Sequence, residues 1–290
     1  MKKILVVVHI YYADQLDFII QNLKNIQTDY DLYVTIVGND RQPTVDKLLE
    51  FNPNCRFVDV ENIGYDVWPF IKIINMVDLS KYSYVIKLHT KRDMPGVTKL
   101  GNGFAVGAKS GWRDDLYAFI KTPENLWKCI KALGGGRVGM CCRYNLKHGK
   151  ANHCGVISVA KKCYPNYVLG LRRYCFVAGT MFISRIEPIQ KLKELNIPKE
   201  LFRKPDAEHS VQFAHVIERT IGECVYKSGM VIDDPFTPKK YIRKVKCLCL
   251  WIKWKKRLIN YLVFPIFVAK YRRKLRMFLR NNYVGTGIII

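Results

Sequence analysis

The sequence predicts an α/β protein built on a doubly wound, mainly parallel sheet, and three observations lead to this prediction. Residues 4–8 form an uninterrupted apolar run, as expected of a strand that is buried on both faces of a parallel sheet. Residues 13–26 then carry apolar side chains at helical spacing. Strand-like and helix-like segments continue to alternate up to residue 88, which is the pattern of successive βαβ units.

The remaining elements follow the same two periodicities. Further strands are predicted over residues 32–37, 56–60, 82–88 and 175–184. Further helices are predicted over residues 44–51, 66–77, 116–133 and 210–221, and three glycines at 134–136 end the third of these. Residues 93–111 contain five Gly and one Pro, and the basic segment 143–173 shows no clear period. Both segments are therefore predicted to be loops.

The charge of the chain is unevenly distributed. The 290 residues are 49% apolar and 25% charged, which is typical of a folded chain with one sizeable core. The formal net charge is +24, and residues 239–280 contain 15 Lys and Arg with no Asp or Glu after Asp234. This leaves only +9 for residues 1–238. We therefore expect a catalytic domain over 1–238 and a basic amphipathic segment over 239–290.

The composition of the basic segment favours a membrane surface as its partner. Its uncharged run, residues 258–269, has twelve residues, whereas a helix needs about twenty to cross a bilayer. Cations interleaved with Trp and aliphatic residues are typical of amphipathic helices that lie on anionic headgroups.

The apolar run over residues 4–8 is too short for a signal peptide, and ten cysteines without such a signal indicate a reducing compartment. The expected location is cytoplasmic and peripheral, on the inner face of the cell membrane.

Positive charge appears abruptly where the strand over residues 82–88 ends. Tyr84-Val-Ile precedes Lys87, His89 and Lys91, so these polar side chains follow a buried stretch. A run of charge usually marks only a solvated surface. Here, however, the charges stand at the carboxyl edge of a predicted parallel strand, where such sheets bind their ligands. The pattern predicts an anionic ligand, a diphosphate, at this edge.

Two neighbouring segments supply further candidate binding residues. Asn62-Ile-Gly64 reads as a tight turn before a helix, in which Gly64 permits the bend and Asp66 stands in the first helical turn. A purely structural role for Asp66 at the helix dipole is the alternative. His9 and Tyr11 follow the first strand, at the place where a nucleotide base or ribose approaches such a sheet.

Trp112 and Arg113 are the remaining candidates for the nucleotide-sugar site. An indole ring offers a stacking surface, and a guanidinium group offers an anion contact, for a sugar or nucleotide. A core position for Trp112 is the equally open alternative.

Seven segments of the chain occur in an order that resembles a known family. They are Val8-His9-Ile10-Tyr11-Tyr12, Asp31-Leu32-Tyr33-Val34-Thr35, Asn62-x-Gly-x-Asp66-Val-x-Pro-Phe70, Tyr84-Val-x-Lys-Leu-His-Thr-Lys91, Gly111-Trp-Arg113, Ala178-Gly-Thr-Met-Phe182 and Ala214-His-x-Ile-Glu-Arg219. Over about residues 4–225 the chain resembles the rhamnan-synthesis F family, bacterial glycosyltransferases that build rhamnose-rich cell-surface polysaccharides.

The resemblance extends to the glycosyltransferase A fold and implies how the donor is bound. In that fold a strand ends in Asp-x-Asp, which holds a divalent metal on the nucleotide diphosphate. This chain has His89-Thr90-Lys91 in that place, and an imidazole and an ammonium do not suit a hard cation. The resemblance therefore implies that fixed cations neutralise the diphosphate and that no metal cofactor is needed.

The resemblance also implies a catalytic base in the second half of the chain. In the related fold an acidic pair before a helix often provides it, and Asp206 and Glu208 stand there. Glu208 is the predicted base, with Asp66 and Glu218 as further options. An ordinary acid at a helix N-terminus is the alternative for Glu208.

The expected activity is transfer of a sugar, rhamnose by resemblance, from a nucleoside diphosphate to a lipid-linked glycan acceptor. Two other classes stay open. The high positive charge of the chain, with aromatic residues among the cations, also suits a nucleic-acid-binding protein, although nucleic acid is not the expected partner. The other class is a non-catalytic scaffold at the membrane.

Overall fold

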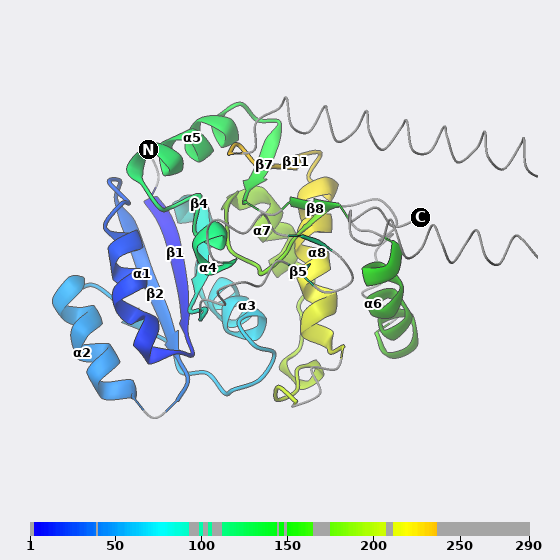
Figure 1. Ribbon diagram of the computed structural model, residues 1–290, viewed down its shortest axis with the longest axis horizontal. Helices are drawn as coiled ribbons and strands as arrows, with labels where there is room; N and C mark the ends of the chain where they lie inside the picture. The colour runs from blue at the N-terminus through cyan, green and yellow to red at the C-terminus, as the bar shows by residue number, and fades with distance from the viewer. Residues whose placement is uncertain are drawn as a thin grey trace, which may run out of the picture. The chain divides into compact units, whose positions relative to one another are not determined.

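The computed structural model describes residues 3–38, 40–92, 99–100, 104–105, 112–143, 145–147, 150–164, 175–206 and 211–236 (Figure 1). The predicted basic segment, 239–290, lies outside these residues, and so does the boundary at 238. The strands are β1 (Lys3–Ile10), β2 (Tyr30–Ile36), β3 (Arg56–Phe57), β4 (Tyr82–His89), β5 (Lys99–Leu100), β6 (Phe104–Ala105), β7 (Val138–Cys141), β8 (Asn145–Lys147), β9 (Cys175–Val177), β10 (Phe182–Arg185) and β11 (Val231–Asp233). The α-helices are α1 (Leu16–Leu23), α2 (Arg41–Phe51), α3 (Val67–Met76), α4 (Trp112–Leu116), α5 (Pro123–Gly134), α6 (Lys150–Cys163), α7 (Ile186–Lys193) and α8 (Phe213–Lys227).

Seven strands form one mixed sheet in the order β11-β7-β10-β4-β1-β2-β3. Within it β10 runs antiparallel to both of its neighbours, and every other pair is parallel. Two short antiparallel pairs, β5–β6 and β8–β9, complete the described strands. The prediction of an α/β protein with a mainly parallel sheet is therefore confirmed.

The centre of the sheet is buried on both faces. Every residue of β1 from Ile4 to Ile10 is buried, which agrees with the uninterrupted apolar run in the sequence. On one face Leu5, Val7 and Val85 form a core with residues of α3, α7 and α8. Because side chains alternate along a strand, the residues between them face the opposite side.

The chain reverses its direction across the sheet after β3. It runs from β1 to β2 to β3 in one direction, and β4 then pairs with the other side of β1. This is the topological switch point of a doubly wound sheet, where ligands bind outside the carboxyl ends of the strands. The switch point lies between the carboxyl ends of β1 and β4.

The predicted helix over residues 116–133 is wrong as a single element, because α4 ends at Leu116 and α5 begins at Pro123. Proline has no N–H for an intrahelical bond and is favoured in the first turn. The Thr122 hydroxyl caps α5 by accepting the N–H of Asn125 at 3.2 Å.

Two other segments also differ from prediction. The predicted loop over 143–173 is wrong in part, because it contains β8 and the helix α6, whose weakly amphipathic sequence hides its period. The predicted strand over 175–184 is divided into β9 and β10 by a turn at Gly179-Thr180, and these two strands join different sheets. Strand β7, helix α7 and strand β11 were not predicted, and β5 and β6 fall within a predicted loop.

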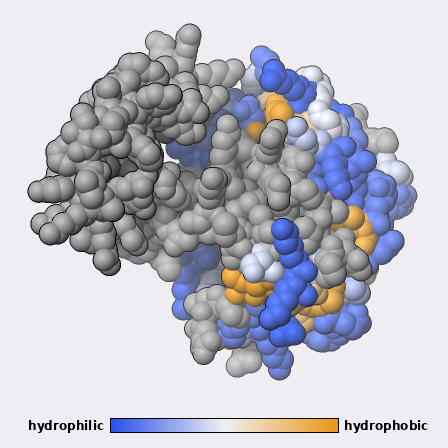
Figure 2. Space-filling view, turned by 90° about the vertical axis from the view of Figure 1, so that its right-hand side faces the viewer, coloured by the Kyte–Doolittle hydropathy of each residue, from blue (hydrophilic) through white to orange (hydrophobic). Residues whose placement is uncertain are grey.

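The chain divides into two units, Met1–Pro95 with Ser110–Phe236, and Gly96–Lys109 with Thr237–Ile290. The first unit contains the seven-stranded sheet, and the β5–β6 pair is the described part of the second. Among the described helices, none has the length and apolar character needed to cross a bilayer. The coloured part of the face in Figure 2 is mostly hydrophilic, with hydrophobic residues in small, separate areas.

Candidate functional site

Strand register brings three polar side chains to the same level of the sheet at the switch point. His9 of β1 pairs with Thr35 on β2 and with His89 on β4. Residues paired in register on parallel strands point to the same face, and Lys87 shares that face because it lies two residues before His89. His9, Lys87 and His89 therefore lie on the face of the sheet that is covered by α3, α7 and α8.

Asp66 reaches this edge from a tight turn before α3. Gly64 and Tyr65 both have positive φ angles, 62° and 54°, and Asp66 is the residue that precedes the first helical residue. The Gly64 N–H donates to the carbonyl of Arg203 at 2.9 Å. A Cβ at Gly64 would lie 2.9 Å from the Cβ of Trp68, so the position needs glycine for space as well as for φ.

Thr180 reaches the same edge from the opposite direction. Because β10 is antiparallel, the turn that precedes it lies beside the carboxyl end of β4, and Phe182 pairs with Lys87. Gly179 and Thr180 have φ angles of 76° and 50°. A β-branched residue with positive φ is a conformational outlier, and such strain clusters at functional sites.

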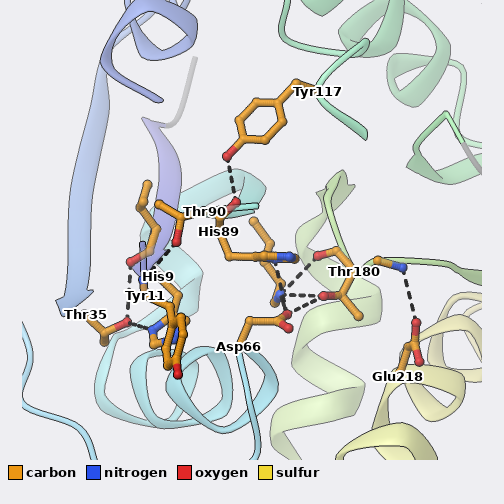
Figure 3. Close-up of polar contacts among 12 residues, drawn as sticks. His9, Tyr11, Thr35, Asp66, His89, Thr90, Tyr117, Thr180 and Glu218 are labelled. Carbon is orange, nitrogen blue, oxygen red and sulfur yellow. Dashed lines mark hydrogen bonds and ion pairs between the residues drawn. The ribbon is translucent and has the colours of Figure 1, made fainter. Parts of the chain in front are cut away.

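Asp66, Lys87 and Thr180 form a closed group of hydrogen bonds (Figure 3). The Lys87 ammonium donates to the Asp66 Oδ2, to the Thr180 Oγ1 at 2.8 Å and to the Thr180 carbonyl at 3.1 Å. The Thr180 hydroxyl in turn donates to the Asp66 Oδ2. We refer to these three residues as the ion-pair group.

The environment of Lys87 bears on its predicted role as a cation that neutralises the diphosphate. Its side chain is 1% exposed, and its three N–H donors already have three oxygen acceptors. Burial lowers the pKa of Lys87 and the Asp66 carboxylate opposes this, while the three acceptors require the protonated amine. Lys87 thus has no donor left for a phosphate and neutralises Asp66 instead.

Asp66 is the ionised partner of this pair. Burial raises the pKa of its carboxyl, but His89, Lys87 and the hydrogen bond from Thr180 outweigh burial and hold the pKa well below its usual range. A carboxylate held in this way is a strong hydrogen-bond acceptor and a weak proton acceptor. This favours a binding role for Asp66 over the role of base.

The two imidazoles at the edge are neutral at pH 7. Burial lowers the pKa of His9 to about 4 and that of His89 to about 3. His9 Nδ1 lies 2.9 Å from the Thr35 hydroxyl, whereas His89 Nδ1 lies 3.4 Å from the Asp66 Oδ2 and has no hydrogen-bond partner among the described residues. The edge therefore holds less positive charge than the sequence suggests.

Thr90 fixes the backbone on either side of this edge. Its N–H donates to the His9 carbonyl at 2.9 Å, and its hydroxyl accepts the N–H groups of Tyr11 and Tyr12 at 2.8 and 3.0 Å. The Tyr117 hydroxyl donates to the His89 carbonyl at 2.7 Å. Tyr11 itself is 47% exposed just beyond β1.

Helix α8 supports the Thr180 turn. The Gly179 N–H donates to the Glu218 Oε1 at 3.3 Å, and Arg219 Nη1 donates to the Glu218 Oε2. Glu218 therefore contacts the turn that holds Thr180 in its strained conformation.

The other predicted site residues lie in several places. Lys91 follows β4 and is half-buried, and Arg92 beside it is exposed, with its guanidinium 3.5 Å from Asp14 and over the Tyr12 ring. Arg113 is directed elsewhere, since its guanidinium lies over the Phe18 ring and donates to Gln15 and Asp114. Asn62 is half-buried in the turn before Gly64.

The predicted base region is described only in part. Asp206 accepts a hydrogen bond from the Gln212 Nε2 at 3.3 Å. Glu208 and the side chain of Trp112 lie outside the described residues. Within the described ranges, no group of three or more His, Cys, Asp or Glu side chains is arranged to hold a metal ion.

Four site residues were missed at the sequence level: Thr35, Thr90, Tyr117 and Thr180. Three of the four lie within or beside the motifs that carry the family resemblance, which is the only sequence signal that could have found them. Tyr117 has no such signal, because its contact with His89 depends on tertiary packing.

The fold is that of a doubly wound α/β protein, and polar side chains gather at the carboxyl edge of its sheet. A family model described as Rhamnan synthesis protein F matches residues 1–111, which confirms the predicted resemblance over that range. His9, Asp66, Lys87 and His89 all lie within the matched residues, whereas Thr180 and Glu218 lie beyond them.

Two curated relatives from strain B100 and a second strain of Xanthomonas campestris pv. campestris are each named Uncharacterized protein WxcX. Each is 22% identical to this chain over 232 residues, which is 77% of this chain and 31% of the relative. The chain thus spans about a third of the length of the curated relatives it matches.

Proposed function

We propose that the chain is a glycosyltransferase that moves rhamnose from a nucleoside diphosphate to a hydroxyl of a growing, lipid-linked cell-surface polysaccharide. The family description, Rhamnan synthesis protein F, supports the sugar and the product class. The proposal also assigns the chain to the glycosyltransferase A fold, which agrees with a doubly wound sheet that contains one antiparallel strand.

One observation supports the proposal most strongly. The described polar groups of the edge gather at the switch point between β1 and β4, from strands, turns and helices that are far apart in the sequence. Doubly wound sheets bind nucleotides in the crevice outside the carboxyl ends of their strands at such a point. Strained turns at Tyr65 and Thr180 border the same place.

The leaving diphosphate needs positive charge that a ligand can reach. Because Lys87 is buried against Asp66, we assign this role to Lys91, with Arg92 beside it, whose ion pair with Asp14 is exposed to solvent. Lys91 ends the His89-Thr90-Lys91 segment, which stands where the related fold carries its metal-binding acids. An ammonium and a guanidinium both bind phosphate oxygens, so a divalent metal is not required.

The base is assigned to the acidic pair before α8. Glu208 is the proposed base, with Asp206 as second choice, because Asp66 is committed to its ion pair. A Glu208→Gln variant should bind donor normally and lose turnover. Near-normal turnover would reject Glu208 and direct attention to Asp206.

The basic segment over residues 239–290 is proposed to dock on anionic lipids at the cytoplasmic face of the membrane. Lipid-linked acceptors are concentrated there, so docking would bring the enzyme to its acceptor. The rival classes make other predictions: a nucleic-acid-binding protein would retard DNA or RNA with a steep salt dependence, and a scaffold would bind no donor.

Calorimetric titration of the full chain with UDP, GDP and dTDP, with and without EDTA, tests donor binding. One of these nucleotides should bind, and EDTA should leave the affinity unchanged. Lys91→Ala and Arg92→Ala should each weaken binding roughly tenfold, as expected for loss of a charge-assisted hydrogen bond. Lys81→Ala is the matched control, because Lys81 is exposed at the opposite end of β4.

Incubation of the bound nucleotide's rhamnose conjugate with a lipid-linked acceptor then tests transfer. Abolition of binding by EDTA would contradict the metal-free site. Equal losses of nucleotide affinity in Lys81→Ala and Lys91→Ala would contradict the placement of the donor site at the carboxyl edge of the sheet.

A further inference from the structure

The two oxygens of the Asp66 carboxylate have different surroundings. Oδ2 accepts hydrogen bonds from Lys87 and Thr180 and faces His89. Oδ1 accepts none from the described residues, and the side chain keeps 18% of its surface exposed. Figure 3 shows the hydrogen bonds of the carboxylate on one oxygen only. The carboxylate is thus fixed through Oδ2 and leaves Oδ1 open to a ligand.

His89 adds a second polar group beside this carboxylate. Its side chain is 9% exposed, and its buried Nδ1 lies 3.4 Å from the Asp66 Oδ2 and makes no hydrogen bond with the described residues. A carboxylate oxygen at this position favours the neutral tautomer that carries its proton on Nδ1. That tautomer leaves Nε2 as a hydrogen-bond acceptor.

The charges of these groups determine which ligand they suit. Asp66 and Lys87 cancel one another, and burial keeps His9 and His89 neutral. A phosphate oxygen placed here would meet a carboxylate oxygen and an imidazole lone pair, so it would be repelled. Hydroxyl groups have hydrogens to donate and carry no charge, and they suit both acceptors.

We propose that the Asp66 Oδ1 and His89 form a hydroxyl-binding subsite, which holds a sugar or ribose hydroxyl of the donor while the diphosphate lies further out, toward Lys91. This inference rests on the proposed function and names the part of the donor that the ion-pair group contacts. Thr180, held by Gly179 and Glu218, orients the carboxylate before the ligand arrives.

Titrations of wild type and Asp66→Asn with four probes test the subsite: pyrophosphate, the nucleoside diphosphate, its 2′,3′-dideoxy analogue and its rhamnose conjugate. Pyrophosphate carries at least as much negative charge as the diphosphate of the donor and has no hydroxyl on carbon. Asp66→Asn should lower the affinity for the ligand that bears the hydroxyl by tenfold to hundredfold, because the variant loses a hydrogen bond to a charged group. The affinity of Asp66→Asn for pyrophosphate should be equal to that of the wild type or higher.

The probes also distinguish the two sources of the hydroxyl. A loss that appears with the nucleoside diphosphate and disappears with its 2′,3′-dideoxy analogue identifies the ribose. A loss confined to the rhamnose conjugate identifies the sugar. An equal loss of affinity for all four probes in Asp66→Asn, pyrophosphate included, would overturn the assignment of the subsite. Unchanged affinity for all four probes would overturn it as well.

Two controls keep the test decisive. If Asp66→Asn is poorly folded, the double variant Asp66→Asn/Lys87→Met removes both buried charges and takes its place. Failure of the wild type to bind any nucleotide would instead contradict the proposed function, and the subsite would fall with it.

Discussion

Replacement of Lys87 by Met tests the ion-pair group directly. The two side chains have similar length, and Met removes only the charge and its three hydrogen bonds. The Asp66 carboxylate would then stay ionised in a nearly enclosed position with Thr180 as its remaining donor. Removing one partner of a buried pair costs about 3–5 kcal/mol, a large fraction of the roughly 5–15 kcal/mol that stabilises a typical fold.

Urea unfolding, followed by tryptophan fluorescence, measures this cost. With a slope of about 2–3 kcal/mol per M, the midpoint of Lys87→Met should fall by about 1–2 M. The double variant Asp66→Asn/Lys87→Met should recover at least about 2 kcal/mol, because it leaves no unpaired charge. Lys81→Met, at the exposed start of β4, should stay within about 0.5 kcal/mol of wild type.

A loss of less than about 1 kcal/mol in Lys87→Met would contradict a buried ion pair at this position. A double variant no more stable than the single one would show that the two charges are not coupled.

Four further results are expected. Thr180→Val, which removes the hydroxyl that bridges the ion pair, should cost about 1–3 kcal/mol in urea unfolding, whereas Thr180→Ser should cost less. Gly64→Ala should cost about 2–4 kcal/mol by the same assay, because its φ is positive and a Cβ finds no space. Stability should fall as the pH drops from about 6.5 to 4, since the unfolded chain takes up protons that buried His9 and His89 do not. Each histidine should account for about 3 kcal/mol by pH 4, and His→Gln variants should flatten the curve. Deletion of residues 239–290 should release the protein from anionic vesicles in a flotation assay, and continued flotation would contradict the membrane role.

The first half of the fold could be predicted because its signals are local. The apolar run in β1 and the helical stripe over residues 13–26 each reflect the burial of one element against its neighbours. The second half depends on single residues that interrupt a pattern. Pro123 divides a predicted helix, and Gly179-Thr180 divides a predicted strand, so the elements on either side had to be found in the structure.

The site shows the same limit. The sequence places Lys87, His89 and Lys91 at the end of a buried strand, and the structure brings the first two to the predicted edge. The sequence does not reveal that the charge of Lys87 is neutralised, because the partners of Lys87, Asp66 and Thr180, are 21 and 93 residues away along the chain. A cation at a strand end looks the same in sequence whether it meets a ligand or an internal carboxylate.

The most direct test of the donor site is a crystal structure of the full chain with the nucleoside diphosphate that binds most tightly. We expect the nucleotide outside the carboxyl ends of β1 and β4, with its phosphates near Lys91 and a hydroxyl within hydrogen-bonding distance of the Asp66 Oδ1. A nucleotide bound anywhere else on the chain, or phosphates in contact with the Asp66 carboxylate, would contradict the account.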